Sequence, residues 1–579
     1  MNGADSGLDD RRHTAADADV DPMGELSRAE TKGTGSTTDD KQRGDAPERR
    51  ATRRKTLFGI GALGAAASGI PVASANGSQG RNNGNDAQSL DTQIVLDWVD
   101  EALETARQGL IIPTSGRVYA FLGTVMYDAV NGIHQQRGAG FEAGDQYAVD
   151  PDVVPGACRV AALAGAANEV LSRLAEEELD DETAADLQDR YDELFEEHLD
   201  EYQDGNQEAG EMWGRQVATE MLEDERGDAE PDCESTFDIA PDKETDLEPG
   251  MAQLTDAWGS ACLADLKPWG LDEPDSVEAP EPPELDSLEF AVEYNRTIVV
   301  GDVNKDENEI QETEVTFSIS EDRYDDEEAR DLVDGNYVAD DELGYSNDLE
   351  YDEDEQKLTL TIDPPDDFRE QGAFWAALGG TPQPEGRWLQ VAGAAVEKEG
   401  PDFYETVRLY ARLGIAVQDA GIANWNNTRR YAEELGWRPH AAIGTEKQTP
   451  EGIEEIVGDL PDADDLDNPD LETKDDWEAI SGWAPAPEYA SGLTTVSTTS
   501  QRLLEKEFGD VGTLEVTVDT AEGNTFTEGD ELTEEFDGFD DARDQAAKSR
   551  VWSGRHYAPA MLAAIDMADQ IVEEVEDTI

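Results

Sequence analysis

The sequence predicts a mostly α-helical protein with one small β-containing insertion. Apolar residues recur at helical spacing over most of the chain, and an alternating two-residue period is confined to two segments. The 579 residues include 37% hydrophobic side chains and 11 tryptophans, which is enough to build a large buried core. This core argues against disorder, although 136 acidic residues stand against 43 basic ones.

Amphipathic helices make up most of the predicted structure. From Tyr191 to Leu199, four apolar side chains and one histidine fall on a single helical stripe, while acidic residues cover the opposite face. Similar patterns predict helices over residues 91–106, 116–134, 157–179, 183–203, 205–223, 370–380, 386–399, 402–425, 496–508, 539–552 and 558–576. Loops that carry proline and glycine separate these helices.

Two regions of the chain break the helical pattern, residues 313–367 and residues 514–518. Residues 315–319 and 358–362 alternate between apolar and polar side chains, which is typical of strands. A very acidic stretch lies between these two runs, so residues 313–367 are predicted to form a β-containing surface insertion. A further strand is predicted at 514–518, in a loop between helices.

The N-terminus resembles an export signal. A long polar stretch leads to Arg53 and Arg54, and a short apolar region then leads to an A-x-A site that ends at Ala75. This arrangement is typical of the twin-arginine pathway, and the apolar region is too short for a comfortable membrane span. We therefore expect residues 1–75 to be removed and residues 76–90 to form a linker. The mature protein, without a membrane span, would be extracellular or at the cell surface.

The net charge of −93 excludes some partners and indicates an environment. So much negative charge repels phosphate backbones and anionic lipids, which makes nucleic acid and membrane surfaces poor partners. The chain has 12 lysines and 31 arginines, so its cations are mostly weakly hydrated guanidinium groups. This composition is typical of a halophilic protein, because concentrated salt screens the repulsion between surface carboxylates.

Histidines are scarce, which narrows the search for a reactive site. After the signal, the histidines are His134, His198, His440 and His556. The first two lie in or next to helical patterns, and we expect each to pack in the core or to cap a helix. The other two each lie beside arginine. The segments concerned are Trp437-Arg438-Pro439-His440, Pro485 to Leu493, and Ser549 to His556.

These segments contain the donors that a tetrahedral oxyanion needs. Arg438 and Arg550 would supply guanidinium groups. Ser491 would add a hydroxyl, and Gly492 a backbone N–H. A neutral His556 could ligate a metal oxyanion or attack a phosphoryl group. From spacing alone, ordinary ion pairs of the two arginines are an equal alternative.

The order of these motifs resembles the vanadium-dependent haloperoxidases, which belong to the type 2 phosphatidic acid phosphatase superfamily. The motifs are Trp-Arg-Pro at 437–439, Pro-x-Pro-Glu-Tyr-x-Ser-Gly at 485–492, and Ser-Arg-x5-His at 549–556. Further similar segments extend the resemblance over residues 91–310 and 368–577. The resemblance implies an all-α fold of two helical bundles, here 91–312 and 368–579, with vanadate held in the second bundle.

The resemblance also implies a role for each site residue. Arg438 and Arg550 would contact the vanadate oxygens, with Ser491 and the Gly492 amide as further donors. His556 would be the axial ligand of vanadium. Vanadate would activate hydrogen peroxide as a Lewis acid, and a halide ion would be oxidised. Hydrogen peroxide and a halide, or a small organic or phosphate substrate, are therefore the expected partners.

Two positions depart from the family pattern. The family has an acid–base histidine directly after Ser-Gly, whereas this chain has Leu493, which cannot move a proton. The family's lysine upstream of Trp-Arg-Pro is replaced by Tyr431, so Arg429 or Arg430 is expected to supply its charge. His440 is the other imidazole near the motifs and is a candidate for the acid–base group.

Three functions fit these residues. The first is a secreted haloperoxidase, weakened by Leu493. The second is a phosphomonoesterase on the same scaffold, and the third is a non-catalytic protein that retains an anion site. Leu493 would remove the nucleophile of a phosphatase outright, whereas a peroxidase would lose proton transfer, worth about 10²–10⁴ in rate. The haloperoxidase is therefore the favoured reading.

Overall fold

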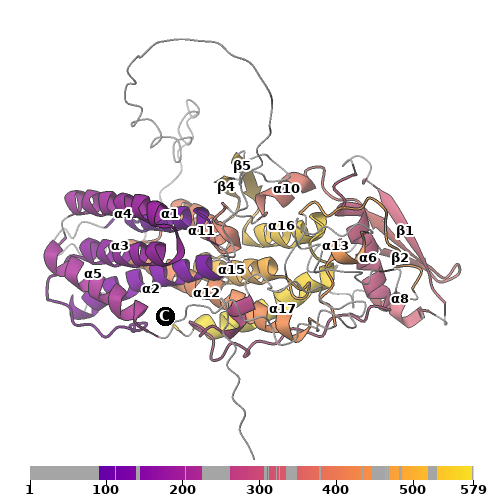
Figure 1. Cartoon of the computed structure of the whole chain (residues 1–579), viewed down its shortest axis with the longest axis horizontal. Coiled ribbons are helices and arrows are strands. Elements are labelled where there is room, and N and C mark those ends of the chain that lie inside the picture. Colours follow the sequence, from indigo (N-terminus) through magenta and orange to yellow (C-terminus); the bar gives the residue numbers. More distant parts are fainter. Residues whose placement is uncertain are drawn as a thin grey trace, which may run out of the picture. The chain divides into compact units, whose positions relative to one another are not determined.

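The computed structural model describes residues 90–579, except for 225–260, 334–348, 445–462, 520–530 and several shorter stretches. The described chain is mostly helical with two small sheets, which confirms the predicted fold class (Figure 1). The predicted signal, residues 1–75, and all of the linker but its last residue lie outside the described residues. None of the described helices is long and apolar enough to cross a membrane.

The N-terminal part of the described chain is a bundle of five helices. They are α1 (Gln93–Arg107), α2 (Ile112–Arg137), α3 (Arg159–Glu178), α4 (Asp181–Glu201) and α5 (Gln207–Leu222). Helix α4 begins where the Asp180 carboxylate accepts hydrogen bonds from two backbone amides of the first turn. Helices α3 and α5 approach closely at Gly214, where a Cβ atom would lie 2.0 Å from the Ala162 carbonyl oxygen. Glycine therefore allows these two backbones to pack side by side (Figure 1).

Apart from one short helix within the predicted insertion, the remaining helices form the C-terminal part. They are η1 (Ala261–Asp265), α6 (Leu288–Val300), α10 (Phe368–Phe374), α11 (Gln383–Glu399), α12 (Phe403–Arg430), α13 (Pro439–Ala442), α15 (Gly492–Phe508), α16 (Phe539–Trp552) and α17 (Ala558–Glu576). Asp402 and Glu405 form a capping box that starts α12. Helix α12 packs against α2 on one side and against α15 and α17 on the other. It therefore connects the N-terminal bundle to the helices that carry the predicted site.

The β structure lies where alternation predicts it. Strands β1 (Thr313–Ser318) and β3 (Lys357–Ile362) pair antiparallel, and β2 (Leu349–Asp352) adds to β3 in the order β1-β3-β2. The predicted strand at 514–518 is β4 (Leu514–Asp519), which pairs with β5 (Glu531–Phe536). Helix α8 (Asp326–Val333), β2 and β5 were not predicted, because their acidic sequences give weak apolar patterns. The boundaries of the insertion at 313 and 367 stay a prediction.

Candidate oxyanion site

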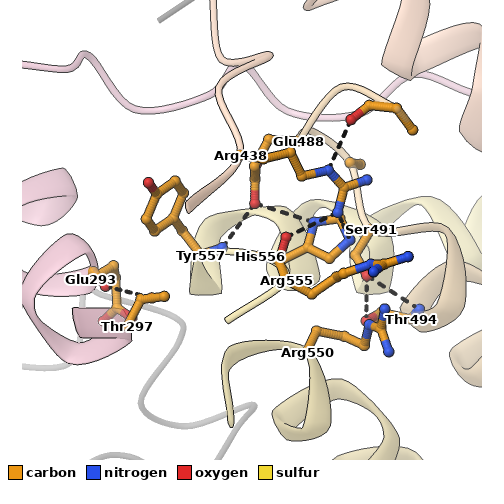
Figure 2. Close-up of polar contacts among 12 residues, drawn as sticks. Glu293, Thr297, Arg438, Glu488, Ser491, Thr494, Arg550, Arg555, His556 and Tyr557 are labelled. Carbon is orange, nitrogen blue, oxygen red and sulfur yellow. Dashed lines mark hydrogen bonds and ion pairs between the residues drawn. The ribbon is translucent and has the colours of Figure 1, made fainter. Parts of the chain in front are cut away.

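Three chain segments bring the predicted site residues together (Figure 2). Arg438 precedes α13, Ser491 precedes α15, and Arg550 lies in the last turn of α16. His556 lies in the turn between α16 and α17. This turn depends on Gly554, which has φ +66° and would bring a Cβ atom within 2.9 Å of the Gly301 carbonyl oxygen.

Hydrogen bonds fix the tautomer of His556. Its Nε2 atom lies 2.8 Å from Nη1 of Arg438, and a guanidinium group can only donate. Nε2 is therefore the unprotonated nitrogen, and the proton resides on Nδ1. That N–H faces the Glu488 carboxyl at 3.2 Å, and the same Oε1 atom accepts from the Tyr557 backbone amide at 2.8 Å. The buried carboxyl thus orients the ring and leaves the Nε2 lone pair directed toward the arginines.

The surroundings keep this imidazole neutral. Burial lowers the pKa of His556 well below its ordinary value, and Arg438, Arg550 and Arg555 lower it further. Burial also raises the pKa of Glu488 to about 8, and the charge of Arg438 opposes that shift. A neutral imidazole is the form that ligates a metal, and here its Nε2 lone pair accepts from Arg438.

Among the described residues, most of the neighbouring charges that act on this histidine and on its arginines are positive. Burial lowers the pKa of Arg438 to about 9, and the next cause is repulsion from Arg555, which Glu488 partly offsets. The pKa of Arg550 is lowered well below its ordinary value by burial, then by Arg555 and Arg438. The Arg550 Nε atom is buried and has no hydrogen-bond partner among the described residues. An anion placed here would meet donors that now repel one another.

Arg555 belongs to the same group, and the sequence interpretation missed it. Its Nη1 atom donates to the Ser481 carbonyl oxygen at 3.0 Å, and its own carbonyl accepts from Arg438 Nη1 at 2.9 Å. Burial lowers its pKa to about 10. The signal was present in the sequence, because Arg555 directly precedes His556 in a chain with few cations.

The start of α15 forms a further wall of the site. This helix begins at Gly492 rather than at the predicted residue 496, because Ser491 acts as its N-cap. The Ser491 hydroxyl lies 2.9 Å from the Thr494 hydroxyl. A Cβ atom on Gly492 would lie 3.1 Å from the Asn424 side-chain oxygen, so glycine permits this close approach. Leu493 is buried in the first turn, in the position where the family has its acid–base histidine.

The structure does not support the expectation for Arg429 and Arg430. Arg429 pairs with Asp265 at 3.2 Å and Arg430 pairs with Glu278 at 2.7 Å, and all four side chains are well exposed. Their charges are therefore neutralised at the surface, at the end of α12, and the additional cation of the site is Arg555. His440 is buried on α13, two residues after Arg438, and its role as an acid–base group stays a prediction.

The residues present fit a metal oxyanion rather than a bare metal cation. Among the described residues, no group of three or more His, Cys, Asp or Glu side chains could hold a cation. The site offers guanidinium groups, a serine hydroxyl, a helix N-terminus and one neutral imidazole nitrogen. Guanidinium groups and helix N-termini bind oxyanions, and the imidazole lone pair can ligate a metal centre. Vanadate combines both features.

Comparison with known proteins supports this reading of the fold. The family model described as the VCPO second helical-bundle domain matches residues 408–579. The described fold is similar to the crystal structure of the first bacterial vanadium-dependent iodoperoxidase, with a TM-score of 0.51 and 18% identity. That alignment covers 84% of this chain and 96% of the iodoperoxidase. A bacterial vanadium-dependent chloroperoxidase in its holo form aligns with a TM-score of 0.44 and 14% identity over 85% of this chain and 97% of its own. No curated protein sequence matches the chain.

Proposed function

We propose that this chain, whose residues 408–579 match the VCPO second helical-bundle domain and whose fold is similar to that of a vanadium-dependent iodoperoxidase, is a vanadate-dependent haloperoxidase. It would oxidise halide ions with hydrogen peroxide. The proposal rests on one observation, the gathering of three guanidinium groups around a buried neutral imidazole. Such a set of donors favours binding of an anion, and the imidazole nitrogen could ligate an anion that contains a metal.

Each residue has a distinct task in this proposal. Arg438 and Arg550 donate to the oxyanion and balance its charge. Ser491 and the first amides of α15 add neutral donors, with the favourable end of the helix dipole behind them. His556 provides the Nε2 ligand, and Glu488 keeps the proton on Nδ1. When bound, vanadate supplies Lewis-acid activation of hydrogen peroxide.

Leu493 sets the expected level of activity. A leucine side chain neither donates nor accepts a proton, so the site lacks acid–base assistance from that position. Proton transfer contributes about 10²–10⁴ in rate, which predicts a slow enzyme that favours iodide and bromide over chloride. The same substitution disfavours the phosphomonoesterase, because that reaction would lose its nucleophile.

Reconstitution with vanadate tests the proposal. Protein freed of vanadium is incubated with orthovanadate in concentrated salt, and bound vanadium and peroxide-dependent bromination of a dye are measured. We expect one vanadium per chain and activity only after loading. Protein that binds no vanadium, or halogenates equally well without it, would overturn the proposal. Vanadate-inhibited hydrolysis of a phosphomonoester without halogenation would support the phosphatase instead.

We also propose that the protein is exported folded through the twin-arginine pathway into concentrated salt. The Arg53-Arg54 motif and the acidic composition support this. Changing both arginines to lysine should retain the full-length precursor inside the cell. Export of this variant at the normal rate would contradict the assignment of the pathway.

A further inference from the structure

We propose that a cavity beside α16 binds an organic ammonium compound with an apolar body. The cavity has a volume of about 530 Å³, which lies in the range of small-molecule sites. It is lined by residues of α6, of the loop after β3 and of α16. The ligand would meet a different face of α16 from the one that carries Arg550, so this proposal does not rest on the proposed function.

Helix α16 gives the cavity a polar wall. Asp541, Gln545, Lys548 and Trp552 all line the cavity, and their spacing of four, three and four residues places them on one face of the helix. Arg550 lies two residues from both Lys548 and Trp552, which is about half a turn round the helix. The same helix thus directs one face toward the oxyanion site and the other toward the cavity.

Apolar groups form much of the remaining wall. Pro364 and Pro365 of the loop after β3 line the cavity, as do Val300 of α6 and the indole of Trp552. Trp552 is buried and packs edge-on against Phe368, with 6.1 Å between the ring centroids. These surfaces favour a ligand with an apolar body, because a hydrated inorganic cation would leave them in contact with water.

Carboxylates outnumber cations around the cavity. Three carboxyl groups line it, those of Asp363, Asp366 and Asp541. The lining cations are Lys548 and Arg296, and the charge of Arg296 is offset by the buried carboxylate of Glu293, 3.2 Å away. Among the described lining residues, Lys548 is therefore left to oppose three carboxylates. Opposite charge in the ligand would reduce the repulsion between them.

Groups at the cavity also indicate a shortage of positive charge and of hydrogen-bond donors. Burial raises the pKa of Glu534 to about 7, and repulsion from Asp367, Glu370 and Asp541 adds to the shift. Gln545 is 9% exposed, and its Oε1 atom has no hydrogen-bond partner among the described residues. An ammonium group carries a positive charge and three N–H donors, so it would offset the carboxylates and satisfy such an acceptor.

Three probes with a phenylpropyl body test the proposal. They are 3-phenylpropylamine, 3-phenylpropanol and 3-phenylpropanoate, whose terminal groups are positive, neutral and negative. Binding to the full chain would be measured by equilibrium dialysis in concentrated potassium chloride, without vanadate or peroxide. We expect the amine to bind most tightly, the alcohol less tightly and the carboxylate least. Methylammonium, which lacks the apolar body, should bind far more weakly than the amine.

Two substitutions with opposite effects locate the binding site. Asp541→Asn removes a carboxylate but keeps an oxygen that can accept from the Asp537 amide. It should weaken binding of the amine by about 2- to 5-fold, the range for a partly exposed ion pair. Lys548→Met removes the opposing cation and should strengthen binding of the amine by a similar factor. The matched controls Asp569→Asn and Lys506→Met, which alter exposed residues of α17 and α15, should bind the amine as the wild type does.

The neutral probe separates charge from damage to the fold. Binding of the alcohol should be the same in the wild type and in both cavity variants. Equal affinities for the three probes, tighter binding of the carboxylate, or unchanged amine affinity in Asp541→Asn and Lys548→Met would overturn the proposal. Halide oxidation plays no part in these measurements. A protein that binds the amine at this cavity but oxidises no halide would therefore overturn the proposed function and support the cavity as a binding site.

Discussion

The arginines of the N-terminal bundle and those around His556 differ in their neighbours. In the N-terminal bundle, each of four arginines lies against a carboxylate of a neighbouring helix or loop. The pairs are Arg117–Glu178 at 3.0 Å, Arg159–Asp204 at 2.7 Å, Arg190–Glu101 at 3.0 Å and Arg215–Glu169 at 2.8 Å. Around His556, the strongest neighbour of Arg438 and of Arg550 is another arginine. In a chain with 136 acidic residues, such an arrangement is conspicuous.

The two bundles also contain comparable histidines in different electrostatic surroundings. His198 is buried and its Nε2 lies 2.9 Å from the Asp97 carboxylate, just as His556 lies beside Glu488. In the N-terminal bundle, Asp97 is one-third exposed and the ring of Trp98 packs edge-on against the imidazole. In the C-terminal bundle, arginines surround the imidazole. A buried histidine–carboxylate pair therefore does not mark the site, whereas the excess of positive charge does.

The largest difference between the two bundles is expected in halide oxidation, when His556 or His198 is exchanged for alanine. His556→Ala should abolish vanadate-dependent halide oxidation, because the ligand of the metal is lost. The arginines of this variant should still bind sulfate. His198→Ala, the matched control, should keep halogenation after the same vanadate loading. Equal loss in both variants, measured in the dye assay and by bound vanadium, would remove the distinction between the two histidines.

Adding an imidazole to the arginine-rich site should increase its activity. Leu493→His is expected to raise peroxide-dependent turnover by about 10²–10⁴, the usual contribution of a positioned acid–base group. His440→Ala is the companion variant, because His440 is the other candidate for that group. No gain from Leu493→His, combined with loss of activity in His440→Ala, would identify His440 as the proton-transfer residue.

Glu385 provides the reverse case, a buried carboxyl without an arginine among the charges that shift its pKa. Burial raises that pKa from 4.5 to about 8, and Oε2 has no hydrogen-bond partner among the described residues. The folded protein thus keeps a proton that the unfolded chain releases above pH 4.5. Stability should consequently fall as pH rises from about 4.5 to about 8. Glu385→Gln should remove this part of the decline and raise the melting temperature by several degrees at pH 8, but by little at pH 5. If the melting temperatures of the two proteins change in the same way between pH 4.5 and pH 8, the assignment is refuted.

The smallest effect is expected for Arg190, an arginine of the N-terminal bundle that is nearly half exposed. Arg190 is nearly half exposed and pairs with Glu101 at 3.0 Å. Arg190→Met should change the free energy of unfolding by no more than about 1 kcal/mol, because the half-exposed guanidinium group is hydrated and its ion pairs are screened by salt. Denaturant titration in concentrated salt measures this directly. A much larger loss would show that arginines paired with carboxylates, and not only those around His556, carry large energies in this protein.

Long apolar stripes made most helices predictable from the sequence, whereas short acidic elements were not predicted. The stripe from Tyr191 to Leu199 lies within α4, and the alternation at 358–362 corresponds to β3. Helix α6 was missed, because it is buried on most sides and shows no clear apolar face. Helix α8 was missed because acidic residues dominate its first turn. Periodicity reports burial on one face, so it fails where an element is buried all round or highly charged.

The sequence predicted those site residues that belong to the family motifs, but not the others. Arg438, Arg550 and His556 are brought together as their order in the sequence indicates, and their roles toward vanadate stay predictions. Arg429 and Arg430 were chosen over Arg555 because they lie close in sequence to the position of the family's lysine. Helix α12 ends with Arg429 at the surface, whereas the turn after α16 carries Arg555 inward. Proximity in sequence could not reveal which end of an element faces the site.

A crystal structure of the protein equilibrated with orthovanadate is the most direct test of the central claim that unneutralised arginines mark an oxyanion site. The account predicts vanadium bonded to Nε2 of His556, with its oxygens in contact with Arg438 and Arg550. The paired arginines of the N-terminal bundle should bind no vanadate. Vanadium absent from His556 under saturating vanadate, or bound instead at the surface ion pairs, would contradict the account.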